Sequence, residues 1–403
     1  MAKSIIVTQI GARHRYLIPR ILHKHGLLYY LFTDSCRYSL LGKLSETLST
    51  FGITTQLTRR LVKRDPQIPK SLIKSSDYLI LKRFINRKSS SLQKYITIYQ
   101  SMSSIFKKYN IENADCIYNM YFENIDFLKY GKHKGKKIIV DIYENPKAFA
   151  ELIEEIKRNP EYASLGHLID EYIDKHILRE KYIEDLFEIA DYYTVPSLFV
   201  LNAIKNYTNF KLEKAFILPY PTSIKPKTYN YHPRRHTLIW VGNDPVRKGL
   251  IYCAKAATIL KKKYSDLDFR IIGKVDDKII KNSAFKDLHF IGVLNAKELQ
   301  QEYETAEAYV FPTLFEGFAG TVIEAASCGC PIITTEGAGT DMDNFPAIYI
   351  PRYNYEAIIS AVISIFENPN IRNELSKKTF EYAKCLSADV YEKNLINIID
   401  NVQ

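Results

Sequence analysis

The stretch that decides the fold is YVFPTLFEGFAGTVIEAASCGCPIITT, residues 309–335. Its apolar start at 309–312 predicts a buried strand that ends at a proline, and a turn with one carboxylate and two glycines follows at 316–320. Thr321 can cap a helix that stops at Gly329, and residues 331–335 predict the next strand. Strand, glycine turn and helix in this order are typical of an α/β domain.

The turn at 316–320 has the chemistry of an anion site. The first amides of a helix have no partner inside it, and the helix dipole adds roughly half a positive charge at that end. The small residues at 317, 319 and 320 let a ligand approach the backbone. Glu316 and Glu324 can both face one cleft, where carboxylates accept hydrogen bonds from sugar hydroxyls. Phosphate together with several hydroxyls indicates a nucleotide sugar, although an ordinary βαβ turn also explains the spacing.

The whole string resembles a known signature. E-G-F-A-G-T-V-I-E followed by A-A-S-C-G-C-P-I-I is similar to the E-x7-E pattern of retaining GT-B glycosyltransferases, in the large group 1 (family four). The resemblance implies an α/β fold of two Rossmann-like, doubly wound domains that face a central cleft. It also implies retaining transfer without a metal ion or other cofactor.

The resemblance assigns roles residue by residue. By the family's pattern Glu324 holds the ribose hydroxyls of the donor, and Glu316 lies near the donor sugar. The turn would bind the donor through Gly317, Phe318, Ala319, Gly320 and Thr321.

Length and composition are those of an ordinary globular protein. The 403 residues are enough for two domains with separate cores, and 46% of them are hydrophobic and 25% charged. No apolar run approaches the roughly 18 residues of a membrane span, and the first residues predict a strand rather than a signal peptide. Six scattered cysteines without zinc-type spacing predict reduced thiols. We therefore expect a cytoplasmic protein.

Positive charge is concentrated in one basic segment, residues 59–94. The net charge of the chain is +11, and this segment holds 11 Lys or Arg against two Asp, interleaved with apolar residues. A solvated face explains such a run, and so does peripheral binding to an anionic membrane surface. Nucleic-acid binding is not expected, because no known nucleic-acid module accompanies the segment.

Strand and helix patterns divide the chain into two domains. Apolar runs at 4–10, 27–33, 114–118, 136–142 and 190–197 predict an N-terminal domain over residues 1–215. Prolines between 219 and 233 mark a linker. Runs at 236–241, 269–272, 288–291, 308–311, 331–335 and 347–350 alternate with helices and predict a parallel C-terminal domain over 216–387. A final helix, within 388–403, would cross back to the N-terminal domain.

A second site segment is WVGNDPVRKG, residues 240–249. It also predicts a strand, a glycine turn and the start of a helix. Its two cations suit a diphosphate, because the Arg guanidinium can donate two hydrogen bonds to a phosphate and the Lys ammonium adds a point charge. The segment is similar to the family's G-R-x-x-x-x-K-G, which carries over Gly242 and Lys248. Asn243 stands where the family usually has arginine, and Arg247 can supply that charge. An exposed basic turn is the alternative.

Further loops complete the expected donor site. Gly11 follows the first strand and matches a glycine that faces the donor in the family, while Gly273 and Val293 match loops around the nucleotide. Arg13 and His14 are candidates to contact phosphate or acceptor. The family's histidine at the donor sugar is replaced here by Tyr-Glu-Asn at 143–145, for which we expect a capping or turn role.

These patterns predict a retaining, metal-independent glycosyltransferase with catalytic roles for Glu316, Lys248 and Arg247. It would move a sugar from a nucleoside-diphosphate sugar to a glycan or lipid-linked glycan in polysaccharide or glycoconjugate synthesis. Two alternatives stay open: a catalytically silent nucleotide-sugar-binding partner of a polysaccharide assembly complex, and an epimerase that acts on a nucleotide sugar.

Overall fold

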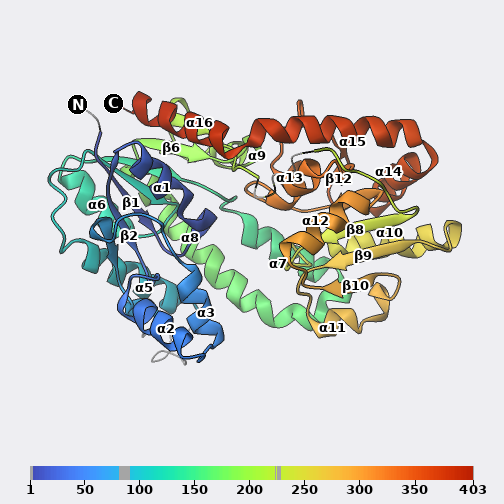
Figure 1. The fold of residues 1–403 in the computed structure, drawn as a ribbon, viewed down its shortest axis with the longest axis horizontal. Coiled ribbons are helices and arrows are strands. Elements are labelled where there is room, and N and C mark those ends of the chain that lie inside the picture. The colour runs from blue at the N-terminus through green and yellow to red at the C-terminus, as the bar shows by residue number, and fades with distance from the viewer. Residues whose placement is uncertain (1–2, 81–90, 223, 225–227, 403) are drawn as a thin grey trace.

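Two α/β bodies make up the protein, each built on its own parallel sheet (Figure 1). The computed structural model describes residues 3–80, 91–222, 224 and 228–402. Four cations of the basic segment, at 82, 83, 87 and 88, and the linker proline at 226 lie outside the described residues. The two-domain, doubly wound α/β class expected from the sequence is confirmed.

The N-terminal sheet has seven strands in the order β3-β2-β1-β4-β5-β6-β7. The strands are β1 (Ile5–Gln9), β2 (Leu28–Thr33), β3 (Ile73–Ser75), β4 (Cys116–Met120), β5 (Lys137–Asp141), β6 (Tyr192–Val195) and β7 (Ala215–Ile217). Its helices are α1 (Leu17–Lys24), α2 (Leu40–Thr50), α3 (Gln56–Lys63), α5 (Ser91–Phe106), α6 (Ile125–His133), α8 (Ile169–Ile189) and α9 (Leu198–Ile204). Every residue of β1 and β4 is buried, because helices cover both faces of the sheet.

The C-terminal sheet has six strands in the order β10-β9-β8-β11-β12-β13. They are β8 (Thr237–Val241), β9 (Asp268–Ile272), β10 (His289–Gly292), β11 (Ala308–Phe311), β12 (Ile332–Thr334) and β13 (Ile348–Tyr349). Between and after them lie α10 (Leu250–Lys263), α11 (Asp277–Ile280), α12 (Ala296–Thr305), α13 (Gly320–Ser327), α14 (Tyr355–Glu367) and α15 (Pro369–Ala383). In both sheets the strand order reverses beside the first strand, where the carboxyl ends of α/β strands bind ligands.

One helical excursion leaves the N-terminal half and packs on the C-terminal domain. It consists of α7 (Ala148–Arg158) and the 3-10 segment η3 (Pro160–Leu168), whose buried residues belong to the core of the C-terminal sheet. α8 then runs back to the N-terminal core (Figure 1). The fully buried Tyr162 fixes the excursion, because its hydroxyl donates to the Pro245 carbonyl (2.8 Å) and accepts from the Ile251 amide (3.0 Å).

Two further elements, both beginning at or after residue 215, pack with the N-terminal domain. β7 belongs to the N-terminal sheet, which therefore extends two residues past position 215. The last helix, α16 (Ala388–Asn401), packs its buried face into the core around β1, and its Glu392 pairs with Lys24 (2.7 Å). Among the described residues, no helix is long and apolar enough to cross a membrane.

Candidate functional site

The turn singled out in the sequence lies between β11 and α13, at the carboxyl edge of the C-terminal sheet. α13 begins at Gly320 with Ala319 as N-cap, and no side chain caps it. The expected capping by Thr321 is therefore wrong: Thr321 lies inside the first turn, where its hydroxyl accepts a hydrogen bond from Tyr309 (2.8 Å). Because no side chain caps the helix, the Gly320 and Thr321 amides stay available to a ligand, whereas the Val322 amide donates to the Ala319 carbonyl (2.9 Å).

Glu316 is the centre of a buried charge cluster. Its carboxylate accepts from Lys248 Nζ (2.9 Å) and also pairs with Arg247, whose Nε lies 3.1 Å from Asp244 Oδ2. The segments are joined through the backbone as well, since the Arg247 carbonyl accepts from the Leu314 amide (2.8 Å). The structure thus brings together the three residues predicted to be catalytic.

Burial and charge act against each other in this cluster. Burial alone would raise the pKa of the Glu316 carboxyl, but Lys248 and Arg247 lower it below its usual value. Burial lowers the pKa of Lys248, and the neighbouring Arg247 lowers it further. The carboxylates of Glu316 and Asp244 balance the charges of the two cations.

Asn243 lies beside this cluster and does not join it. Its side chain is exposed, and its Oδ1 accepts from the Lys274 amide (2.8 Å). The same two loops meet at Gly242 and Gly273, where a Cβ on Gly273 would come within 2.0 Å of the Gly242 carbonyl oxygen. Asn243 therefore joins the loop after β8 to the loop after β9 through a hydrogen bond. Arg247, and not Asn243, pairs with Glu316.

Residues 10–16 face the cluster from the N-terminal domain. Three residues in succession, 14–16, have φ values of 46, 51 and 58°, a left-handed turn that is strained for side chains other than glycine. The Gln9 amide holds the turn by donating to the carbonyls of Gly11 and Arg13 (3.0 Å each). The Gly11 amide donates to Asp34 (2.9 Å), so Gly11 supports the turn from below.

This turn directs two side chains into the space between the domains. The Arg13 guanidinium lies over the Tyr143 ring, 3.2 Å from its centroid, and His14 stacks on Tyr220 at 4.0 Å. Burial, with the charge of Arg13, lowers the pKa of His14 to about 4, so its imidazole is neutral at pH 7. Below them burial raises the pKa of Glu123, which accepts from the Ile10 amide, to about 8.

Residues 143–145, which replace the family's histidine, divide their roles. Tyr143 packs under Arg13, and Glu144 pairs with Arg179. Asn145 makes the expected turn contact, because its Oδ1 accepts from the Lys147 amide (2.9 Å). A Cβ on Gly317 would lie 1.7 Å from the Tyr143 carbonyl oxygen, so glycine is required where the two domains touch.

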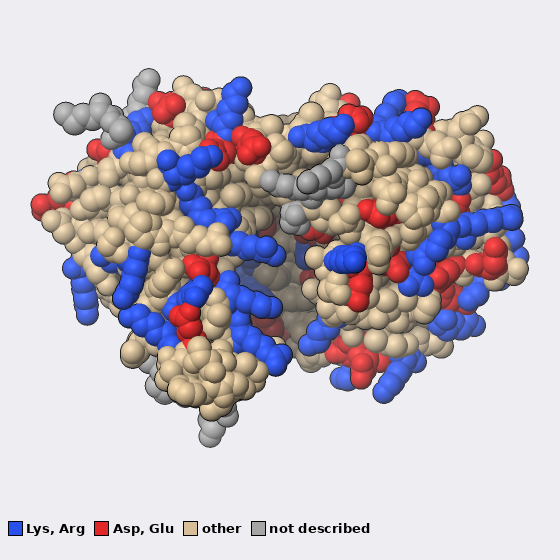
Figure 2. Space-filling model, in the orientation of Figure 1, with Lys and Arg blue, Asp and Glu red and all other residues tan. Residues whose placement is uncertain are grey.

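These groups line a cleft of about 440 Å³ between the domains, visible as the hollow between the two lobes in Figure 2. Of the predicted site residues it is lined by Arg247, Glu316, Gly317 and Phe318, and it adds Arg13 and His14. Lys248 reaches it through Glu316. Aromatic and basic groups that the sequence pattern did not mark also line it: Tyr143, Phe149, Tyr172, Lys175 and Tyr220.

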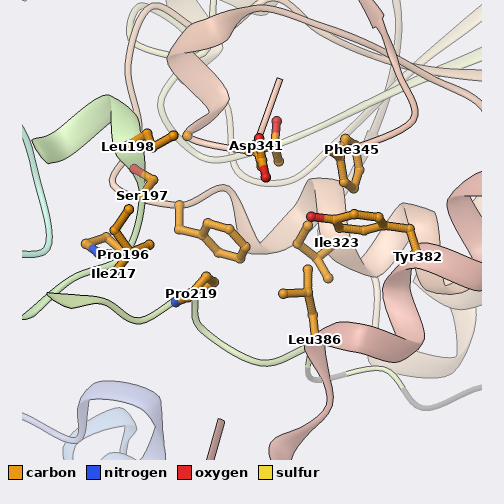
Figure 3. A pocket seen from close by; sticks show the side chains of 13 residues that line it. Pro196, Ser197, Leu198, Ile217, Pro219, Ile323, Asp341, Phe345, Tyr382 and Leu386 are labelled. Carbon is orange, nitrogen blue, oxygen red and sulfur yellow. The ribbon is translucent and has the colours of Figure 1, made fainter. Parts of the chain in front are cut away.

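The other residues expected to bind the donor do not line this cleft. Glu324 is half-buried on α13, and Val293 is 73% exposed in the loop after β10. A smaller apolar cavity of about 130 Å³ lies on the other side of the 317–320 turn (Figure 3). Ile217 and Pro219 line it from the N-terminal side and Ile323 from α13. Phe318 lines both spaces and separates them. In the described part of the chain, no group of three or more His, Cys, Asp or Glu is placed to hold a metal ion.

Two parallel doubly wound domains with charged helix-start loops facing one cleft define the GT-B class. Residues 235–368 match the family described as "Glycosyl transferases group 1". The poly(glycerol-phosphate) alpha-glucosyltransferase of Bacillus subtilis (strain 168) is 23% identical over 289 residues, which cover 67% of this chain and 42% of that protein. The C-terminal domain is therefore similar to group 1 glycosyltransferases, and the whole chain has the fold of GT-B structures. The chain spans less than half the length of this curated relative.

Solved structures agree with the fold. Sucrose-phosphate synthase from Thermosynechococcus elongatus has a TM-score of 0.66 at 15% identity, over 99% of this chain and 98% of that one. Anabaena HepE in complex with UDP and glucose has a TM-score of 0.61 at 10% identity, over 99% of this chain and 100% of that one. At these identities the likeness supports the fold alone.

Proposed function

We propose that this protein transfers a sugar from a nucleoside-diphosphate sugar to a glycan or lipid-linked glycan, with retention and without a metal ion or cofactor. The observation that carries the proposal is the pairing of Lys248 and Arg247 with Glu316, directly beside the uncapped start of α13. Two buried cations and open amides on one cleft wall are suited to a diphosphate.

Each group would have a separate task in the reaction. Arg247 and Lys248 stabilise the charge on the diphosphate as the bond from its β-phosphate oxygen to the anomeric carbon breaks. Amides of the 317–321 turn bind the same leaving group, except that of Ala319, which donates to the Ala338 carbonyl (2.9 Å). Glu324 accepts from the ribose hydroxyls. Glu316 lies near the donor sugar. The acceptor oxygen forms the new bond to the anomeric carbon, and its proton passes to the departing β-phosphate oxygen. Contact between the domains at Gly317 excludes water from the cleft.

The relatives favour an enzyme over the silent binding partner. The Bacillus relative is named as a glucosyltransferase that acts on a poly(glycerol phosphate), which supports a glycan or similar polymer as acceptor. HepE, whose fold this chain shares, was solved with UDP and glucose, so a nucleotide-sugar donor is consistent with a fold of this kind. The cytoplasm remains the expected location.

The test is a thermal-shift screen with UDP, GDP, ADP, CMP and their common sugar conjugates. A ligand that binds only the folded protein at about a hundred times its Kd stabilises it by about 2.7 kcal/mol. We expect one nucleoside diphosphate to raise the Tm. Glu324→Ala should abolish the shift, and Glu356→Ala, on the first turn of α14, should keep it. Absence of any shift would contradict the proposal.

Transfer itself is measured with the donor that the screen identifies. Retention predicts that the product keeps the anomeric configuration of the donor sugar, as read by NMR. Metal independence predicts full turnover in EDTA. Loss of turnover in EDTA or an inverted product would refute that part of the proposal, and donor conversion without any acceptor would favour an epimerase.

A further inference from the structure

Exposed apolar side chains gather at one place on the N-terminal domain. Five large ones fall within residues 40–57, with exposed fractions up to 79% for Leu40 and 76% for Phe51; the others are Leu44, Ile53 and Leu57. Residues 40–63, which form α2, α3 and the loop between them, are called the α2–α3 tip below. Every residue from 50 to 57 is exposed. Large apolar side chains clustered on a surface mark an interaction site.

The tip is a well-defined structure. Ser39 caps the start of α2, and the Ile53 amide bonds back to the Leu48 carbonyl (2.9 Å) at its end, across Gly52 with φ 77°. Thr55 and Thr58 form a reciprocal capping box at the start of α3. The folded backbone therefore holds Phe51 and Ile53 outward at the apex.

Cations flank the apolar apex. The tip contains Lys43, Arg59, Arg60 and Lys63 against a single acid, Glu46, which pairs with Arg37. Among the residues that the structure describes, none of these four cations makes an ion pair. The Lys43 ammonium even lowers the pKa of the neighbouring Lys70. In Figure 2 the lower end of the left lobe, where α2 and α3 lie in Figure 1, is tan at its tip and blue on the side toward the cleft.

The tip is connected to the cleft by a short chain of polar contacts. α3 ends at Arg64, whose buried guanidinium pairs with Asp34. Asp34 in turn accepts from the Gly11 amide (2.9 Å), at the start of the turn that carries Arg13 and His14. These contacts place the tip next to the turn that lines the N-terminal side of the cleft, so a partner bound to the tip would lie close to the cleft.

We propose that the α2–α3 tip docks on an anionic lipid surface. The apolar side chains enter the interface between headgroups and acyl chains, and the flanking cations lie against lipid phosphates. The positive charge of the tip favours an anionic lipid surface over a second copy of the chain, because a two-fold symmetric dimer contact would bring two unpaired basic surfaces together. The proposal places docking on residues 40–63, whereas the sequence had indicated 59–94, and it does not depend on the transfer reaction.

The test is vesicle flotation of the purified protein with two compositions, phosphatidylcholine alone and phosphatidylcholine mixed with phosphatidylglycerol. We expect binding only to the mixed vesicles and its loss in high salt. Neutralising the cations of α3, in Arg59→Gln/Arg60→Gln/Lys63→Gln, should weaken binding by roughly fivefold per cation and on the order of 100-fold in total. The matched control, Lys278→Gln/Lys281→Gln/Lys286→Gln, removes three exposed lysines of the C-terminal domain and should bind normally.

The apolar part is tested separately with Phe51→Ser/Ile53→Ser, which should lower binding at least about tenfold. The control is Ile371→Ser, an exposed apolar residue of α15. All four variants change exposed residues, so an unchanged Tm and circular dichroism spectrum are expected.

Three results would overturn the proposal. The first is equal binding to both compositions, and the second is anionic binding that survives both tip variants. The third is absence of vesicle binding with a concentration-dependent dimer that Phe51→Ser/Ile53→Ser abolishes, which would make a second copy the occupant. Failure of the nucleotide screen would leave this test untouched, because flotation requires no donor.

Discussion

Glu316→Gln separates the two roles of the charge cluster. Glu316 neutralises Lys248 (2.9 Å) and Arg247, and all three side chains are largely buried. The substitution leaves two buried cations with too little negative charge, and removal of one partner of a buried pair costs about 3 kcal/mol at the lower end of the usual range. At roughly 2–4 °C per kcal/mol, the Tm should fall by roughly 6–12 °C.

A nucleoside diphosphate should reverse this loss. Its negative charge replaces that of Glu316, so UDP, GDP, ADP or inorganic pyrophosphate should stabilise Glu316→Gln more than the wild type. We expect a gain of about 1.4 kcal/mol, which corresponds to a tenfold lower Kd. Transfer should fall as well, because the carboxylate proposed to lie near the donor sugar is lost.

The control is Glu302→Gln. Glu302 is as buried as Glu316 and also serves two cations, Arg270 (2.9 Å) and Arg234 (2.6 Å), but it does not line the cleft. It should lose a similar amount of stability and gain nothing from the diphosphate. If Glu316→Gln is destabilised but shifts with the diphosphate no more than the wild type, the diphosphate does not meet these cations and the reasoning is refuted.

Further predictions concern the rest of the site. Lys248→Ala and Glu324→Ala should each lower transfer by about 100-fold with the fold intact by circular dichroism; unchanged turnover in both would reject the site. Tyr162→Phe should lower the free energy of unfolding by about 1–2 kcal/mol and raise the Kd for nucleotide, because the 244–251 segment loses its hydrogen bonds to the hydroxyl. The control, Tyr193→Phe, removes a buried hydrogen bond inside the N-terminal domain and should lower stability without changing the Kd. Because burial raises the pKa of Glu123 to about 8, the folded protein keeps a proton that the unfolded chain releases above about pH 4.5. Stability should therefore fall as pH rises from 5 to 8. Glu123→Gln should flatten this part of the Tm–pH profile, and an unchanged slope would mean that another group titrates.

Most of the fold could be predicted because buried parallel strands are short apolar runs between helices. All six strands of the C-terminal sheet lie on runs marked in the sequence. β3 was missed: it is a three-residue edge strand, and Lys74 and Ser75 interrupt its apolar character. An edge strand is paired on one side only, so its sequence carries a weaker signal.

The charge cluster was predictable for a topological reason. β8 and β11 are neighbours in the sheet, so the loops after them meet at one edge and bring Lys248 to Glu316. Tyr162 could not be found this way. Its partner Pro245 lies 83 residues away in sequence, and nothing local to η3 indicates that this segment packs on the other domain. The part played by Asn243 was hidden for the same reason, since its contact with Lys274 depends on two separate loops.

The excursion of residues 148–168 has a consequence for anyone who builds hybrids of this enzyme class. A chimera joined at the proline-containing linker would carry the C-terminal domain without Tyr162, Glu151 and Glu155, which bind Pro245, Arg352 and Tyr252. The recipient's own excursion would then meet a foreign 244–251 segment. An exchange that preserves these contacts must include two separate pieces of sequence, 148–168 and the C-terminal domain. The unit of recombination therefore differs from the one that the linker indicates.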